Sequence, residues 1–414
     1  MNEGVNNSEQ FVYEVCQRSF LSLWSYVNPQ GKSPNKELCD ILVVCDPHVI
    51  VISVKDVELK QTGNTEVNSD RWQRKAIEAS RKQISGAIRW LDTAIEVIAK
   101  DGAKGLPLPS KDRRIYHRVA IAFGGRREVP IVAHNSKSDP FVHVFDEGSF
   151  YLLLRHLDTI SDFVQYLGSK EKLLDNTSVL IEGGEENLLA VYLHRGRNFP
   201  AKVDRFIIPG DLWKDFSSKE EVLAKRQKDE ESYVWDRLIE SFCYGGFDTE
   251  TWRGPGLSES ERALRVLALE SRFSRRILGR AFKGFLEASK AQKIRARMVM
   301  SDSGIGYVFF TYDANSSLEE RRNELVGRCF ASLCSFPQVS TVIGININVP
   351  GDSPRFGFTT DLALLHADDA NWPEEFLEKA RFFRDEMGYF KSPNTSMVRE
   401  DEYPDLMKDN GPNL

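Results

Sequence analysis

The feature that most constrains the fold is a pair of apolar runs near the amino terminus, Ile41–Val44 and Val49–Val54. Both runs consist almost entirely of β-branched or other apolar residues, which favours strands that are covered on both faces. The residues between them, Cys45–His48, include a proline where no ladder N–H is needed, and this predicts a tight turn. We therefore expect a buried antiparallel hairpin whose two outer ends lie together.

Charged residues flank this hairpin. Glu37 and Asp40 precede the first run, and Lys55 and Asp56 follow the second. A buried hairpin should not hold charge without a partner or a function. Carboxylates bind hard divalent cations through oxygen, and a lysine beside them can stabilise phosphoryl charge or orient water. The pattern predicts phosphodiester cleavage assisted by Mg²⁺ or Mn²⁺. The alternative is a buried hairpin whose end charges are solvated or paired.

The same stretch resembles the PD-(D/E)XK nuclease superfamily, which has the restriction-endonuclease-like fold, and within it the NERD-like branch. The family pattern is an Asp at one strand and Glu-x-Lys on the next. Asp40 matches the Asp, and Ser53-Val54-Lys55 follows after twelve residues in place of Glu-x-Lys. The resemblance covers about residues 8 to 125. It implies an α/β core in which a mixed sheet is flanked by helices.

The resemblance also implies roles for these residues. Glu37 and Asp40 would hold the metal, Ser53 and the carbonyl of Val54 would contribute to its shell, and Lys55 would position the attacking water. Ser53 departs from the family pattern, because a serine hydroxyl is a weaker metal ligand than the carboxylate it replaces. Glu37 could supply the missing carboxylate.

Helices are expected on either side of the hairpin. Apolar residues at helical spacing predict one helix over residues 8 to 27 and a long one from about Arg71 to Lys100, capped by Ser69 or Asp70. In the resembling nucleases the later helix often places a Gln or Lys at the metal site, and Gln83 occupies the matching position. The earlier helix often offers an acid, for which Glu14 is the candidate.

Basic residues gather on the first half of the long helix. They can form a row that follows a phosphate backbone, or they can simply form a solvated face. The nucleic-acid contacts we predict there are Arg71, Arg74, Lys75 and Lys82. Arginines between residues 113 and 127 extend this basic surface. A second basic cluster, at Arg272, Arg275, Arg276, Arg280 and Lys283, is expected either to face nucleic acid or to lie in water.

Composition limits the classes of protein to consider. The chain has 414 residues and a formal net charge of −6, so nucleic-acid binding would have to use local basic patches. No apolar run approaches the roughly 20 residues that span a bilayer, and no signal peptide is visible. Six scattered cysteines without CxxC spacing are typical of free thiols in a reducing cytoplasm.

The length allows two or three domains. We predict a nuclease-like domain over residues 1–175, connecting strands and a charged helical linker over 176–257, and an α+β module over 258–414. Within these, residues 189–194 are expected to form a strand, and one helix is expected from residue 258 to 293 with a break near Gly279 or Gly284. In the last part, a strand–strand–helix–strand–strand order predicts a small sheet with a helix on one face.

The sequence thus predicts a Mg²⁺- or Mn²⁺-dependent nuclease that cleaves DNA in preference to RNA. The C-terminal module would recognise a substrate, a protein partner or a signal, and this plan resembles that of effectors in bacterial antiviral defence. The alternative is a catalytically degenerate member of the fold that serves as a nucleic-acid-binding or scaffold subunit. Ser53 favours that alternative.

Overall fold

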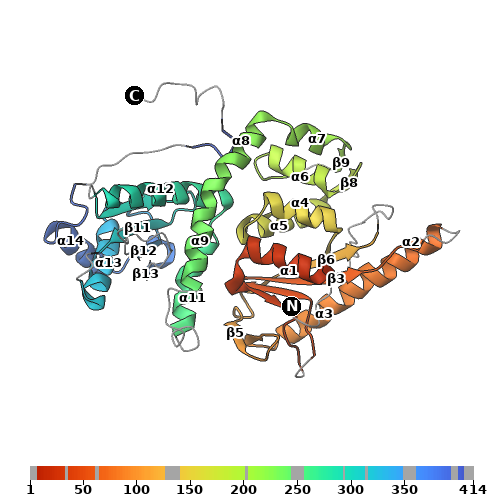
Figure 1. Ribbon diagram of the computed structural model, residues 1–414, viewed down its shortest axis with the longest axis horizontal. Coiled ribbons are helices and arrows are strands. Elements are labelled where there is room, and N and C mark those ends of the chain that lie inside the picture. Colours follow the sequence, from red (N-terminus) through yellow and green to blue (C-terminus); the bar gives the residue numbers. More distant parts are fainter. Residues whose placement is uncertain are drawn as a thin grey trace. The chain divides into compact units, whose positions relative to one another are not determined.

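The computed structural model of this α/β chain describes residues 7–32, 36–60, 65–125, 140–200, 204–243, 256–291, 294–312, 316–347, 360–392 and 400–404. The chain divides into two compact units, residues 1–222 and 223–414 (Figure 1). Residues 176–222 of the predicted connecting segment fall in the first unit. Within the described ranges, no helix combines the length and the apolar character needed to cross a membrane.

The first unit is built on a five-stranded mixed sheet with the order β1-β2-β3-β6-β7. The predicted hairpin is present, with Ile41 paired to Ile52 across an antiparallel ladder. β1 is antiparallel to β2, whereas β6 runs parallel to β3 and β7 parallel to β6. The strands are β1 (Ser25–Val27), β2 (Ile41–Cys45), β3 (His48–Asp56), β6 (Ile115–Phe123) and β7 (His143–Phe145).

Helices pack beside this sheet. α1 (Asn7–Phe20) contacts β1 and β3, and α3 (Ala79–Leu91) contacts β3 and β6. The apolar side chains of α3 meet one face of the sheet in a continuous core, in which Ile84 and Leu91 pack with Val49 and Val51. This core fixes the position of α3 over the end of β3.

The long helix differs from its prediction at both ends. It begins at Thr65, six residues before the predicted start, and continues through α2 (Thr65–Gln73), the π-helical turn η2 (Arg74–Glu78) and α3. It ends at Leu91, nine residues early, because the guanidinium of Arg114 donates to the carbonyls of Leu91 and Ala94 and so satisfies the last turn. The following residues instead form β4 (Glu96–Ile98), paired with β5 (Lys104–Pro107).

The remainder of the first unit holds a small parallel pair of strands. The predicted strand over residues 189–194 was wrong, because these residues belong to a helix, α6 (Glu185–His194). β8 (Ser178–Ile181) and β9 (Arg205–Ile208) run parallel, and a parallel pair needs a crossover connection, which α6 provides. The other helices are α4 (Glu147–His156), α5 (Ile160–Asn176), α7 (Leu212–Ser217) and α8 (Glu220–Asp229).

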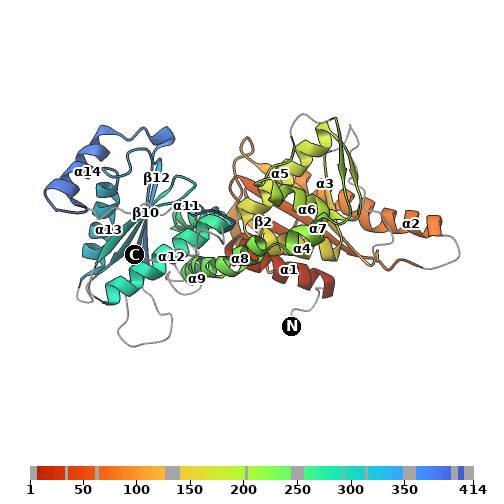
Figure 2. The same cartoon turned by 90° about the horizontal axis from the view of Figure 1, so that it is seen from above.

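The second unit has the predicted order of strand, strand, helix, strand, strand. Its sheet, β10-β11-β12-β13, is covered by α12 (Arg272–Lys290) on one face and α13 (Leu318–Ser332) on the other (Figure 2). A capping box at Ser317 starts α13. The other elements are η3 (Glu230–Ser232), α9 (Tyr233–Ser241), α11 (Gly256–Ala268), β10 (Ala296–Met300), β11 (Gly306–Thr311), β12 (Thr341–Ile347), β13 (Thr360–His366), η5 (Asp368–Ala370) and α14 (Glu374–Asp385).

The break expected near Gly279 or Gly284 lies elsewhere. α11 ends at Ala268 and α12 begins at Arg272, where the side chain of Ser271 caps the new helix. Gly279 lies inside α12. It allows the helix to pack closely against Glu231, because a Cβ at this position would lie 2.5 Å from the carbonyl oxygen of Glu231.

Candidate active site

The candidate site lies where β2 begins and β3 ends. Asp40 directly precedes β2, and Ser53, Val54 and Lys55 are in the last four residues of β3. Continuing the ladder register from the Ile41–Ile52 pair places Asp40 opposite Ser53. Ser53 and Lys55 alternate with Val54 along the strand, so they point to the face that α3 covers.

Asp40 is the centre of the cluster. Its side chain is almost fully buried and accepts hydrogen bonds from three residues on two elements, β3 and α3. One oxygen, Oδ2, accepts from the backbone N–H of Val54 at 2.5 Å and lies 3.4 Å from the Nζ atom of Lys55. The other oxygen, Oδ1, accepts from Nε2 of Gln83 at 3.3 Å. Asp40 and Lys55 therefore lie together at one end of the hairpin, as the position of the two runs predicts.

Gln83 links the remaining predicted residues. The Ser53 hydroxyl, which is fully buried, donates to Oε1 of Gln83 at 2.9 Å. The amide nitrogen of the same side chain lies 3.5 Å from Oε1 of Glu37 as well as within reach of Asp40. The structure thus brings Glu37, Asp40, Ser53, Lys55 and Gln83 together, with the peptide group of Val54 among them.

Glu37 reaches the site from an irregular segment. Its backbone forms an isolated bridge with Gln30, and the next residue, Leu38, donates its N–H to the carbonyl of Pro29 at 2.8 Å. These two contacts hold the segment against the loop that follows β1. Glu37 is exposed, whereas Asp40 is buried.

The two acids of the cluster are electrostatically coupled. Partial burial raises the pKa of Glu37 to about 7, and the hydrogen bond and negative charge of Asp40 act in the same direction. Glu9 adds to this rise, whereas Lys55 opposes it. A cation bound between Glu37 and Asp40 would offset the repulsion between their negative charges.

Glu9, rather than Glu14, is the α1 acid that acts on this site. Glu14 is exposed and accepts a hydrogen bond from Gln10 at 2.8 Å. Glu9 stands three and seven residues before Val12 and Cys16, which are buried, so it shares their side of the helix. The helical period of the buried residues could have selected Glu9 from the sequence.

The donors present suit Mg²⁺ in number and type. Mg²⁺ keeps several waters and is commonly held by one or two carboxylates together with substrate phosphate oxygens. Glu37 and Asp40 supply two carboxylates, and the Ser53 hydroxyl is a third oxygen close to them. Across the ranges given above, no group of three or more His, Cys, Asp or Glu side chains is arranged to hold a metal.

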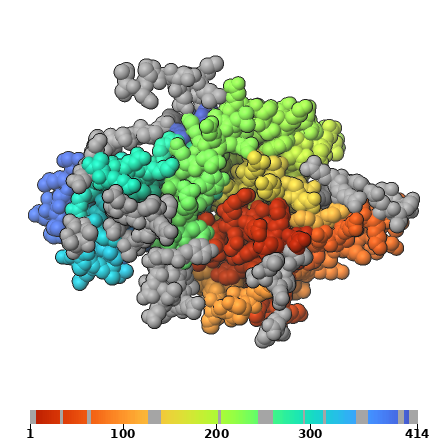
Figure 3. Space-filling view, viewed as in Figure 1, coloured from red at the N-terminus to blue at the C-terminus, as the bar shows by residue number. Residues whose placement is uncertain are grey.

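A row of basic residues lies along the α2–α3 helix. The predicted contacts Arg71, Arg74, Lys75 and Lys82 are all exposed, as is Arg89. Arg71 lies on α2 and Lys75 on the π-helical turn η2, and Lys82 and Arg89, which are seven residues apart, lie on one side of α3. This segment is orange in Figure 3 and reaches the surface on the face shown. Gln83 adjoins Lys82 in the chain, so the row passes close to the cluster.

The other predicted basic surfaces differ from expectation. Arg113 pairs with Asp46 at 3.2 Å, and Arg114 is used to bind backbone carbonyls. Arg126 and Arg127 lie outside the described residues.

The expectation for the second basic cluster is wrong for three of its five residues, because these three arginines are buried, whereas Arg280 is partly exposed and Lys283 is exposed. Arg272 and Arg275 bind Asp236, and Arg276 binds Asp229 at 3.0 Å. Their charges are neutralised within the second unit.

Comparison of the chain with protein-family models, with curated proteins and with solved structures finds no match.

Proposed function

We propose that this chain is a Mg²⁺- or Mn²⁺-dependent nuclease with a restriction-endonuclease-like core, acting on DNA in preference to RNA. The observation that supports it best is the convergence of Glu37, Asp40, Ser53, Lys55 and Gln83, from three separate segments, at one end of a sheet. An acidic pair can hold a divalent cation, and a lysine beside it can stabilise phosphoryl charge, which are both functions in metal-assisted hydrolysis of a phosphodiester.

The arrangement of the first unit supports the same proposal. A helix, three antiparallel strands, a second helix, the separate β4–β5 pair and a further strand parallel to the third follow one another from α1 to β6. In the nuclease superfamily that the sequence resembles, this order sets the Asp and the Glu-x-Lys residues side by side.

The residues can be given roles in the reaction. Asp40 and Glu37 would hold the metal, which when bound would stabilise phosphoryl charge and lower the pKa of water. Lys55 would orient the attacking water, since its side chain is partly exposed while its ammonium group lies 3.4 Å from Asp40. Gln83 would hold both acids in place through its amide nitrogen. The basic row on α2–α3 would bind the phosphate backbone next to the site.

A non-cleaving scaffold or nucleic-acid-binding subunit is the second candidate. It is favoured by Ser53, whose hydroxyl is already bonded to Gln83 where the family has a carboxylate. A protein of this kind would bind nucleic acid through the same basic row and leave it intact. In either case, the second unit would recognise a protein partner or a signal, in a plan similar to that of antiviral defence effectors.

A cleavage assay separates the two candidates. Supercoiled plasmid, single-stranded DNA and RNA oligonucleotides would each be incubated with the purified full chain in Mg²⁺, in Mn²⁺ and in EDTA. The proposal predicts cleavage of DNA that EDTA abolishes. Binding without cleavage of any substrate in either metal would favour the scaffold and overturn the nuclease.

A further inference from the structure

The first unit contains a pocket far along the chain from the acidic cluster, formed by α6, β9, α7 and the residues just after α7. Its volume is about 250 Å³. The floor is apolar, and the rim holds ionisable side chains. The floor residues are Ala190, Val191, Phe206, Leu212 and Phe216, and the rim residues are His194, Arg195, Asp215 and Lys219.

The volume limits the size of a ligand. An apolar cavity of roughly 150 Å³ accepts benzene, whereas drug-sized ligands occupy roughly 300–1,000 Å³. A pocket between these sizes suits one or two fused rings. Because Phe206 and Phe216 lie among the lining residues, a flat apolar body would find aromatic side chains to pack against.

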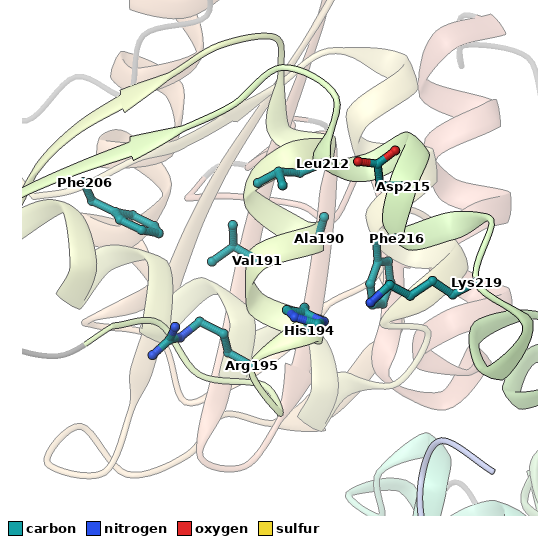
Figure 4. Close-up of a pocket in the computed structure, with 9 residues that line it drawn as sticks. All are labelled: Ala190, Val191, His194, Arg195, Phe206, Leu212, Asp215, Phe216 and Lys219. Atoms are coloured by element: carbon teal, nitrogen blue, oxygen red, sulfur yellow. The ribbon is translucent and has the colours of Figure 1, made fainter. Parts of the chain in front are cut away.

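The charged side chains at the rim indicate which polar group the ligand should carry. In the view of Figure 4, His194, Arg195 and Lys219 lie along one side of the pocket, and the carboxylate of Asp215 lies on the opposite side. Among the residues that the structure describes, neither Arg195 nor Lys219 forms an ion pair. Two unpaired cations beside an apolar floor leave positive charge available to an anionic group.

We infer that this pocket binds a small amphiphilic anion, consisting of a one- or two-ring apolar body with a single carboxylate, sulfonate or phosphate. The apolar body would lie on Val191, Leu212 and Phe206, and the anionic group would point to Arg195 and Lys219. The inference does not depend on the nuclease proposal, because it uses none of the residues of the acidic cluster.

Calorimetric titration of the full chain with 2-naphthoate tests the inference, with the neutral 2-naphthalenemethanol as the matched ligand. Since two partly exposed cations would contact the carboxylate, we expect 2-naphthoate to bind roughly tenfold more tightly than the alcohol. The double variant Arg195→Ala/Lys219→Ala should remove that preference and keep the weaker, apolar binding.

Two further variants test whether the ligands bind in this pocket. Val191→Phe should fill the pocket and weaken both ligands, whereas Leu180→Phe, at a side chain 60% exposed on β8, should leave both unchanged. The surface variant Lys219→Glu, which has no reason to unfold the chain, should reverse the charge preference. Equal affinity for the two ligands, absence of binding by both, or an unchanged affinity in Val191→Phe would each overturn the inference.

Discussion

Gln83 is the residue on which the geometry of the candidate site depends. Its amide group accepts from the Ser53 hydroxyl and donates toward both Asp40 and Glu37. A glutamine can do this because it is both donor and acceptor, and a lysine at the same position could only donate. In this chain the Ser53–Gln83 pair occupies the space where the resembling family has a carboxylate.

Restoring that carboxylate should strengthen metal binding. Ser53→Glu alone would crowd Gln83, because Ser53 is fully buried against it, so the change is best made together with Gln83→Ala. We expect Ser53→Glu/Gln83→Ala to need roughly tenfold less Mg²⁺ for half-maximal cleavage than Gln83→Ala alone. Metal-titrated cleavage of the two variants measures the difference.

The opposite result, a fall in cleavage, is expected if Glu37 already occupies the position of the added carboxylate. If Glu37 already fills the position, a further acid would repel it, cleavage would fall, and the additional change Glu37→Gln should recover it. Identical metal dependence in all the variants would mean that Ser53 does not face the metal.

A buried histidine should make stability depend on pH. Burial, with the neighbouring His48 and Arg118, lowers the pKa of His117 to about 3, and its Nε2 atom lies 3.1 Å from Nδ1 of His48. The His117 side chain takes up a proton below about pH 6.5 in the unfolded chain but stays neutral in the folded chain. The free energy of unfolding that depends on neutral His117 is therefore complete above pH 6.5 and is lost as the pH falls toward 3.

The substitution His117→Gln should remove this contribution while keeping a hydrogen-bonding side chain. We expect the free energy of unfolding to fall less steeply with acid in the variant, by up to about 1.4 kcal/mol per pH unit below 6.5. Urea unfolding at a series of pH values gives both slopes. Parallel slopes would show that His117 takes up its proton over the same pH range in the folded and unfolded chain, and would contradict this prediction.

At the scale of elements, the α2–α3 helix presents the basic row. Reversing Arg74, Lys75 and Lys82 to Glu should weaken nucleic-acid binding for every sequence alike. The dependence of log affinity on log salt should also become shallower, by about one for each phosphate that the variant no longer neutralises. Binding isotherms between low and moderate salt test both effects.

A charge-matched control shows whether the loss of affinity depends on the position of the reversed residues or only on the change in net charge. Lys172, Arg205 and Lys214 are exposed on other elements of the first unit, and their reversal to Glu makes the same change in total charge. This control should retain most of the affinity. Equal loss in the two triple variants, or affinity that is flat with salt in the wild type, would make the row a solvated face.

A buried charge on α12 stabilises the fold of the second unit. Arg275 is fully buried, with Nη1 2.6 Å from Oδ1 of Asp236 and Nε bonded to the carbonyl of Glu270. Arg275→Met would leave Asp236 buried with one partner fewer, at a cost of about 3–5 kcal/mol. Arg280→Met, at a partly exposed side chain, should cost less than about 1 kcal/mol. Denaturant unfolding of both variants gives the comparison, and similar costs would contradict the structural role.

The elements differ in how well the sequence predicted them. The hairpin and the order of strands in the second unit could be predicted, because short apolar runs with turn residues between them specify strands locally. The end of α3 could not, because it depends on Arg114, which is 23 residues further along the chain than Leu91. α6 was missed because a short apolar run does not distinguish a strand from a buried helix.

The same contrast holds for the charged residues. The residues of the acidic cluster could be predicted, since the pattern of the hairpin puts their segments at one end. The burial of Arg272, Arg275 and Arg276 could not, because their partners Asp229 and Asp236 come from other helices. A run of basic residues on a helix looks alike in sequence whether it contacts solvent, phosphate or buried acids.

At the scale of the whole molecule, the first unit contains the acidic cluster, the basic row and the apolar pocket, and the second unit contains the buried arginine network. A nuclease account assigns chemistry to the first unit and leaves recognition of a partner or signal to the second. A scaffold account keeps the binding surfaces and removes the chemistry. The two accounts differ in whether Asp40 is a ligand or only a structural acceptor.

Asp40 also contributes to stability, which determines how it should be tested. Its Oδ2 atom accepts the N–H of Val54, so Asp40→Ala would leave a buried donor without a partner at a cost of about 1–3 kcal/mol. Asp40→Asn keeps an oxygen acceptor of the same shape and removes the charge. Asp112→Asn, at an exposed turn, makes the same chemical change away from the site.

The most direct test is therefore the rate of DNA cleavage in Mg²⁺ by the wild type, Asp40→Asn and Asp112→Asn, with folding of each checked by denaturant unfolding. A carboxylate that holds the metal should be worth at least roughly 100-fold in rate, so Asp40→Asn should lose activity while Asp112→Asn retains it. Wild-type cleavage by a well-folded Asp40→Asn would contradict the account.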